Sequence, residues 1–163
     1  MPIVEINQIK ELLPKRKRLM GIDHGSKTWG LAIADGNLKI ATPLTTIRLT
    51  KFSQNIIELA KICAEYDIAG FIIGLPLNMD GSSGGRVDSV KHFAINLIDA
   101  KEILGFEPLI TFYDERLSTH TMESFLIEEI DMSRKKRDKI IDKMAAQVIL
   151  QSALNAINNV NNK

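Results

Sequence analysis

The chain has 163 residues, of which 45% are hydrophobic and 25% charged, and 21 Lys and Arg against 20 Asp and Glu leave a net charge of +1. This length is typical of one domain with a core that needs no disulfides, and the composition excludes disordered and fibrous chains. No apolar run approaches the roughly 20 residues of a membrane span. The N-terminal basic residues follow the apolar ones, the reverse of a secretory signal, and the single cysteine, Cys63, fits a reducing compartment. We therefore expect a cytoplasmic protein with Cys63 buried as a small hydrophobe.

The N-terminal half predicts an antiparallel meander. A short amphipathic segment at residues 4–13 precedes three strands, at residues 19–22, 29–34 and 38–41, the third resuming at 45–47. The Asp35-Gly36-Asn37 sequence between the second and third strands is a hairpin turn pattern. Consecutive strands joined by short turns of this kind pair in an antiparallel arrangement.

The C-terminal half alternates helices with apolar strands. Helical spacing covers residues 52–66, 87–104, 119–130 and 139–155, and apolar runs at 69–75 and 108–113 predict strands covered on both faces. The order predicts an α/β fold with a mixed five-stranded sheet flanked by helices. We expect one domain at residues 18–157, an N-terminal extension at 1–17 and a frayed tail at 158–163.

Several acidic residues lie in or next to apolar segments that we expect to be buried, where a charge is not needed to keep the surface soluble. Asp23 interrupts the apolar first strand, and Asp114 and Glu115 end the last strand. Asp142 shares a face of the final helix with several apolar residues that we expect to pack on the sheet: Ala145, Ala146, Ile149 and Ala153. For any one of these acids alone, a salt bridge or a helix-terminus charge is the favoured interpretation.

Several acids that converge from different elements repel one another unless a cation lies among them. Carboxylates of this kind suit Mg²⁺ or Mn²⁺, and two such ions roughly 4 Å apart activate water and stabilise the leaving oxygen in phosphodiester hydrolysis. His24 is adjacent to Asp23, but consecutive strand residues face opposite ways, so we interpret His24 as structural. The basic clusters at residues 15–18 and 134–137 could contact phosphates, although solvated surface is the favoured interpretation for either one alone.

Four blocks of sequence together resemble the YqgF/RuvX family. They are GIDHGSKTWGLAIAD, FIIGLPLNMDGSSGGR, YDERLST and IDKMAAQVILQSAL, and they run from about Arg18 to the final helix. This family is related to Holliday-junction resolvases and assigned to maturation of the 5′ end of pre-16S rRNA. The resemblance implies a ribonuclease-H-like fold, a divalent-metal-dependent nuclease activity with Mg²⁺ or Mn²⁺, and nucleic acid or ribosomal particles as partners of a monomer or homodimer.

The resemblance also assigns roles to individual residues. Asp23, Glu115 and Asp142 match the metal-binding catalytic acids, with Asp114 as an assisting neighbour. The substrate contacts that we expect are Lys27, Asn78, Arg86 and Arg116. Asp138, one turn before Asp142, is interpreted as surface charge rather than as a further ligand.

Three other interpretations are weighed against this one. GIDHGSKTWG alone also resembles the phosphate loop of actin-like kinases, but those enzymes close a nucleotide between two such domains and this chain supplies one. A ribonuclease-H-like module that binds nucleic acid without cutting it would be favoured by loss of one acid, and all three are present. The third is a resolvase acting on four-way DNA, and the residues do not decide between RNA and DNA.

Overall fold

A computed structural model describes residues 3–77, 84–117 and 134–161, and in the last helix it describes side chains from residue 144 to 159. The five strands are β1 (Arg18–His24), β2 (Thr28–Ala34), β3 (Ala41–Arg48), β4 (Ile68–Leu75) and β5 (Leu109–Asp114). They form one sheet in the order β3-β2-β1-β4-β5. β2 is antiparallel to β1 and β3, whereas β1, β4 and β5 run parallel. The predicted mixed five-stranded sheet is confirmed.

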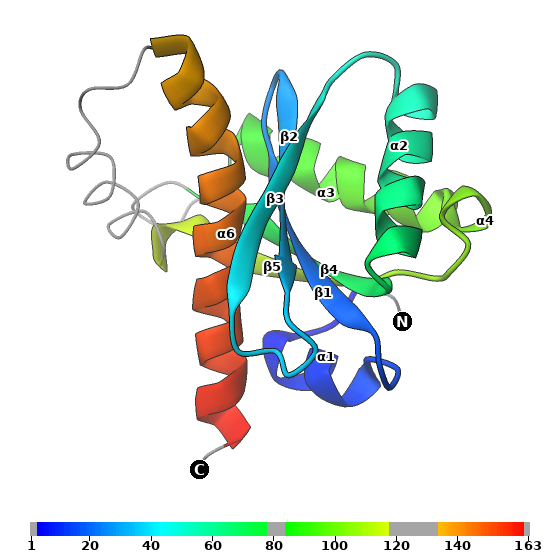
Figure 1. The fold of residues 1–163 in the computed structure, drawn as a ribbon, viewed down its shortest axis with the longest axis vertical. Helices are drawn as coiled ribbons and strands as arrows, with labels where there is room; N and C mark the ends of the chain where they lie inside the picture. The colour runs from blue at the N-terminus through cyan, green and yellow to red at the C-terminus, as the bar shows by residue number, and fades with distance from the viewer. Residues whose placement is uncertain (1–2, 78–83, 118–133, 162–163) are drawn as a thin grey trace.

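Helices cover both faces of the sheet (Figure 1). α1 (Ile6–Leu12) and α6 (Arg134–Asn161) pack on one face. α2 (Phe52–Glu65), α3 (Gly85–Asp99) and the short α4 (Lys101–Leu104) pack on the other. Each face carries its own apolar core, and Cys63 is buried in the core beneath α2, as predicted.

α6 lies close against the centre of the sheet. A Cβ at Gly21 of β1 would lie 2.7 Å from Leu150 Cβ and 2.8 Å from the Ala146 carbonyl oxygen, so only glycine permits this approach. The Gln151 side chain hydrogen-bonds the helix to the start of β3. It accepts a hydrogen bond from Ala41 N (2.8 Å) and donates one to the Lys39 carbonyl (2.9 Å). Because the C-terminal end of α6 lies near the β2–β3 turn, its N-terminal part lies toward the C-terminal end of β1.

Several predicted boundaries differ from the structure. The third strand begins at Ala41 rather than residue 38, because Asp35 Oδ1 accepts hydrogen bonds from the backbone of Lys39 (2.7 Å) and Ile40 (2.9 Å) and closes the turn. Leu38 lies in this turn with a positive φ of 56°. The helix predicted at residues 87–104 is divided at Ala100 into α3 and α4. The helix predicted at residues 119–130 lies outside the described residues.

The first and last described segments of the chain pack on the domain. Val4 N donates to the Ile110 carbonyl of β5 (2.8 Å), and Ile9 of α1 is fully buried. α6 is helical through Asn161, beyond the start of the tail predicted to fray at residue 158. In the basic cluster at residues 15–18, Arg18 donates to the Tyr66 carbonyl (2.9 Å), and Lys17 lies 3.9 Å from the Asp67 carboxylate. This cluster precedes β1 and is therefore at the end of the strand remote from Asp23.

Candidate active site

Two of the predicted acids meet at one edge of the sheet. Asp23 is the penultimate residue of β1, and Glu115 directly follows β5 at the start of a short 3-10 helix (Glu115–Leu117). Their side chains are joined by a hydrogen bond. Since one of two carboxyl groups must donate in such a bond, the pair shares a proton when no cation lies between them.

Gly74, near the end of β4, makes room for Glu115. A Cβ at Gly74 would lie 2.5 Å from Glu115 Oε1 and 2.6 Å from Ile149 Cδ1 of α6. The Glu115 side chain therefore crosses β4 on the face covered by α6. Any larger residue at position 74 would displace the carboxyl group or the helix.

Burial raises the pKa of Glu115 above its ordinary value of 4.5. The positive charge of Arg86 and the hydrogen bond with Asp23 act in the opposite direction, and the charge of Asp114 adds to the rise. Arg86 lies in the first turn of α3, is exposed, and is the basic residue whose charge acts on Glu115. The structure thus brings this predicted substrate contact near the acid pair.

Asp114 and Arg116, which flank Glu115, bind each other. The Arg116 guanidinium donates to Asp114 Oδ2 at 2.6 Å from Nη2 and 2.9 Å from Nε, and Arg116 N donates to Asp114 Oδ1 at 3.0 Å. These bonds, and the Arg116 side-chain bonds above all, lower the pKa of Asp114. The pair closes the turn that carries Glu115. The sequence analysis treated Asp114 and Arg116 as two independent site residues and did not predict that they bind each other.

The backbone of α6 brings Asp142 to the level of the pair. Residue 142 precedes Ala146 by four residues of helix, about 6 Å along the axis, and Ala146 contacts Gly21, two residues before Asp23. The side chains of Asp142 and Asp138 lie outside the described part of the chain, as do those of the basic cluster at residues 134–137. Among the side chains that are described, no group of three His, Cys, Asp or Glu is placed to hold a metal ion.

Of the remaining predicted contacts, the structure describes Lys27. Lys27 is exposed in the β1–β2 turn, where its carbonyl accepts from Leu49 N (2.9 Å). Asn78 lies outside the described residues. His24 points to the opposite face of the sheet, where its ring lies 4.5 Å from that of Phe93. Burial, the largest cause, lowers the pKa of His24, so its imidazole is mainly neutral at pH 7.

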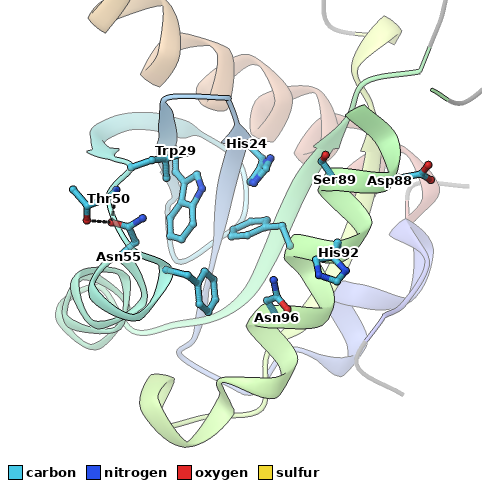
Figure 2. A pocket seen from close by; sticks show the side chains of 11 residues that line it. His24, Trp29, Thr50, Asn55, Asp88, Ser89, His92 and Asn96 are labelled. Atoms are coloured by element: carbon cyan, nitrogen blue, oxygen red, sulfur yellow. Dashed lines mark hydrogen bonds between the residues drawn. The ribbon is translucent and has the colours of Figure 1, made fainter. Parts of the chain in front are cut away.

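A pocket on that opposite face was not predicted from the sequence. It has a volume of about 570 Å³ and lies between the start of α2, α3 and the adjacent ends of β1 and β2 (Figure 2). Its lining residues are His24, Trp29, Leu49, Thr50, Phe52, Asn55, Asp88, Ser89, His92, Phe93 and Asn96. Successive residues of a strand face opposite sides of the sheet, so the alternation that places Asp23 on one face places His24 and its cross-strand partner Trp29 on the other. This alternation was the sequence signal that could have indicated a second site on that face.

No helix in the described part of the chain is long and apolar enough to cross a membrane. A crystal structure of the yeast mitochondrial Holliday junction resolvase Ydc2 resembles the chain with a TM-score of 0.50 and 12% identity, covering 96% of this chain and 87% of that one. This likeness concerns the fold, which is ribonuclease-H-like, as the sequence predicts.

Close relatives are found by sequence. A protein of Rhodospirillum centenum is 47% identical over 96% of this chain and 83% of its own, and one of Rhodobacter capsulatus is 50% identical over 89% and 87%. Both carry the name "Putative pre-16S rRNA nuclease". The sequence profile described as "RuvX: Holliday junction resolvase" matches residues 17–156. With a match over this much of its length, the chain belongs to the RuvX family.

Proposed function

We propose that this protein is a divalent-metal-dependent nuclease that hydrolyses phosphodiester bonds in the 5′-end processing of pre-16S rRNA. The observation that carries the proposal is the hydrogen-bonded pair of Asp23 and Glu115 at the carboxyl ends of parallel strands, the usual place for chemistry in open α/β sheets. The names of the relatives support the RNA substrate. Such a substrate places the activity in the cytoplasm, on ribosomal precursor particles.

The residues fit a hard divalent cation. Two carboxyl groups that share a proton offer the oxygen ligands that Mg²⁺ and Mn²⁺ prefer, and a cation between them would replace that proton. Asp142, whose backbone lies at the level of Asp23, would supply the third carboxylate. Arg86 brings a positive charge close to Glu115, as binding of a phosphate oxygen at this edge requires.

Asp23, Glu115 and Asp142 would hold the divalent ion, which would supply an activated water and stabilisation of the leaving oxygen. Asp23 lies near the end of β1 and Glu115 directly follows β5, so the two carboxyl groups approach the proposed ion site from different strands. β4 lies between these strands and fixes their separation. Gly74 leaves room for the Glu115 carboxyl group, and the Asp114–Arg116 pair holds the turn from which Glu115 projects. Arg86 and Lys27 would bind phosphate groups of the substrate on either side of the scissile bond, with Asn78 as a further contact.

The test compares three substrates under the same conditions. A pre-16S rRNA fragment with its 5′ extension, an unstructured single-stranded RNA and a four-way DNA junction are each incubated with Mg²⁺, with Mn²⁺ or with EDTA. We expect cleavage of the precursor RNA at its 5′ side with either metal and none with EDTA. Preferential cleavage of the junction would replace the RNA assignment with the resolvase activity that the family description names.

Asp23→Asn is the matched variant, since it keeps the size of the side chain and its capacity to hydrogen-bond Glu115. We expect a folded protein that still binds RNA and does not cleave it. Cleavage at the wild-type rate by this variant would refute the assignment of Asp23 as a metal ligand. Binding of RNA by the wild-type protein without cleavage under any metal condition would instead favour a module that binds nucleic acid without cutting it.

A further inference from the structure

We propose that the pocket on the opposite face of β1 binds one unstacked nucleobase of the nucleic acid whose backbone lies at Asp23 and Glu115. This inference rests on the proposed function and names a recognition element for the same site. The pocket opens at the sheet edge where β1 ends and β2 begins, so its lining residue His24 directly follows Asp23. Its volume of about 570 Å³ lies within the usual range of small-ligand pockets, roughly 300–1,000 Å³.

Aromatic rings form the walls of this pocket. Phe93 of α3 lies 4.8 Å from the Trp29 ring and 4.5 Å from the His24 ring, and Phe52 at the start of α2 lies 6.1 Å from Trp29, edge to face. These rings come from β1 and β2 and from the two helices α2 and α3, and Figure 2 labels His24 and Trp29 among them. Nucleobases stack on aromatic faces without regard to sequence, so such walls suit a flat heterocycle.

Polar groups in the lining suit the edge of a base. Trp29 Nε1 is buried and has no hydrogen-bond acceptor, the one such side-chain atom among the described residues. A donor left in this condition costs about 1–3 kcal/mol until an acceptor reaches it. Asn55 Oδ1 accepts from Thr50 N and Oγ1 at 3.3 and 3.0 Å, which fixes the amide orientation and leaves its NH₂ group on the other side (Figure 2). Both groups are donors, and base carbonyls and ring nitrogens are acceptors.

The charge of the lining favours a base over a phosphate. The described residues that line the pocket include no Lys or Arg, and the acidic residue among them, Asp88, would repel a phosphate group. The charge of Arg86, two residues before Asp88, acts both on His24 at the pocket and on Glu115 at the acid pair. A nucleotide with its base in the pocket would therefore present its phosphate to Arg86, and the chain would continue over the end of β1 to the acids.

The single tryptophan makes the proposal directly measurable, since all indole fluorescence of the protein comes from Trp29. Single-stranded RNA hexamers are titrated into the Asp23→Asn protein with Mg²⁺, and binding is followed in parallel by the anisotropy of a fluorophore at the RNA 3′ end. We expect saturable quenching of the Trp29 emission with the same midpoint as the anisotropy. Hexamers with one abasic residue, moved along the sequence, should lose quenching at one position. RNA binding without quenching, or quenching unaffected by every abasic position, would overturn the proposal.

Phe52→Ala tests the wall of the pocket with a matched control. Phe52 is 36% exposed, so its truncation spares the core, and Ile57→Ala removes an exposed side chain of the same helix that does not line the pocket. We expect Phe52→Ala to weaken RNA binding about fivefold or more, from the loss of one stacking surface, and Ile57→Ala to bind as the parent does. Equal affinities for the two variants would refute the stacking role of Phe52.

The two hypotheses fail in different ways. If the wild-type protein cleaves no substrate with either metal while Trp29 is still quenched by intact but not abasic RNA, the nuclease assignment fails and the base pocket stands. If cleavage occurs and depends on Asp23 while Trp29 does not respond to RNA, the pocket proposal fails and the nuclease stands. Quenching by a peptide with an exposed aromatic side chain, but not by RNA, would reassign the pocket to a protein partner.

Discussion

Replacement of Gly74 by alanine is expected to damage the acid pair more than the fold. The new Cβ would lie 2.5 Å from Glu115 Oε1, 2.9 Å from Glu115 Cγ and 2.6 Å from Ile149 Cδ1. Carbon atoms pack best at about 3.5–4.0 Å, so the two side chains must each move by roughly 1 Å. Overpacking of this kind costs about 1–3 kcal/mol of folding free energy. Each kcal/mol lowers the Tm of a chain of this size by about 2–4 °C.

The effect on cleavage should be larger than the effect on stability. A displacement of about 1 Å in a catalytic constellation costs on the order of 100-fold in rate. Gly70→Ala is the matched control, because Gly70 lies on the same strand and the same face, and its Cβ would meet Leu19 Cδ2 at 2.7 Å, remote from the acids. We expect Gly70→Ala to lower the Tm while leaving the rate of cleavage per folded molecule unchanged.

Two measurements decide the outcome. Thermal unfolding followed by circular dichroism gives the Tm of each variant, and initial rates of precursor RNA cleavage with Mg²⁺ are compared at a temperature where all variants are folded. If Gly74→Ala loses stability but cleaves as fast as the wild-type protein, Glu115 is not held against Gly74 for catalysis. The geometric basis of the proposed site would then be wrong.

Three further predictions concern charge, burial and packing. In EDTA the Asp23–Glu115 pair shares a proton, and an amide at position 23 can still hydrogen-bond Glu115, so Asp23→Asn should leave the Tm within about 2–4 °C of the wild-type value, the shift that 1 kcal/mol produces; a larger rise would indicate like-charge repulsion instead of a shared proton. Burial raises the pKa of the Cys63 thiol to about 12, so its protonated form stabilises the fold at neutral pH, and this contribution falls as the pH rises from about 9 toward 12. A thiolate-specific reagent should therefore react with one thiol per chain only after unfolding. Fast reaction of the native protein would refute the burial of Cys63. Gln151→Ala removes the hydrogen bonds to Ala41 and Lys39 and should lower the free energy of unfolding in urea by about 1–3 kcal/mol, whereas an unchanged value would show that the apolar face of α6 suffices to hold β3.

Local sequence patterns were enough to predict the sheet and two of its acids. The apolar runs that contain Asp23 and precede Glu115 predict buried strands with acids at their ends, and these two side chains meet in the structure. The third strand was placed too early because Leu38 looks like a strand residue, whereas the Asp35 side chain closes the turn around it. The division between α3 and α4 at Ala100 has no glycine or proline to predict it.

Features that depend on tertiary contacts could not be predicted in the same way. Asp114 and Arg116 each have the residue type and position expected of a site residue. Their pairing depends on the tight turn between them, which the amino-acid sequence alone does not specify. The pocket requires Phe93 of α3 to come against Trp29 of β2, two residues far apart in the chain. Aromatic residues at such positions are more often plain core, and only the packed structure shows the hollow beside them.

The register of the sheet explains why the two faces of one strand end differ in what they can bind. Asp23 pairs across β1 and β2 with Gly30, and on the other side it follows the Ile22–Ile73 pair, which places it beside Gly74 of β4. Two glycines therefore flank the carboxyl group, and the space above Gly74 admits the Glu115 side chain, so the second acid can reach the first. His24, one residue further, pairs with Trp29, so the opposite face at the same strand end is walled by rings. A single step along β1 thus separates a site suited to a charged backbone from one suited to a flat base.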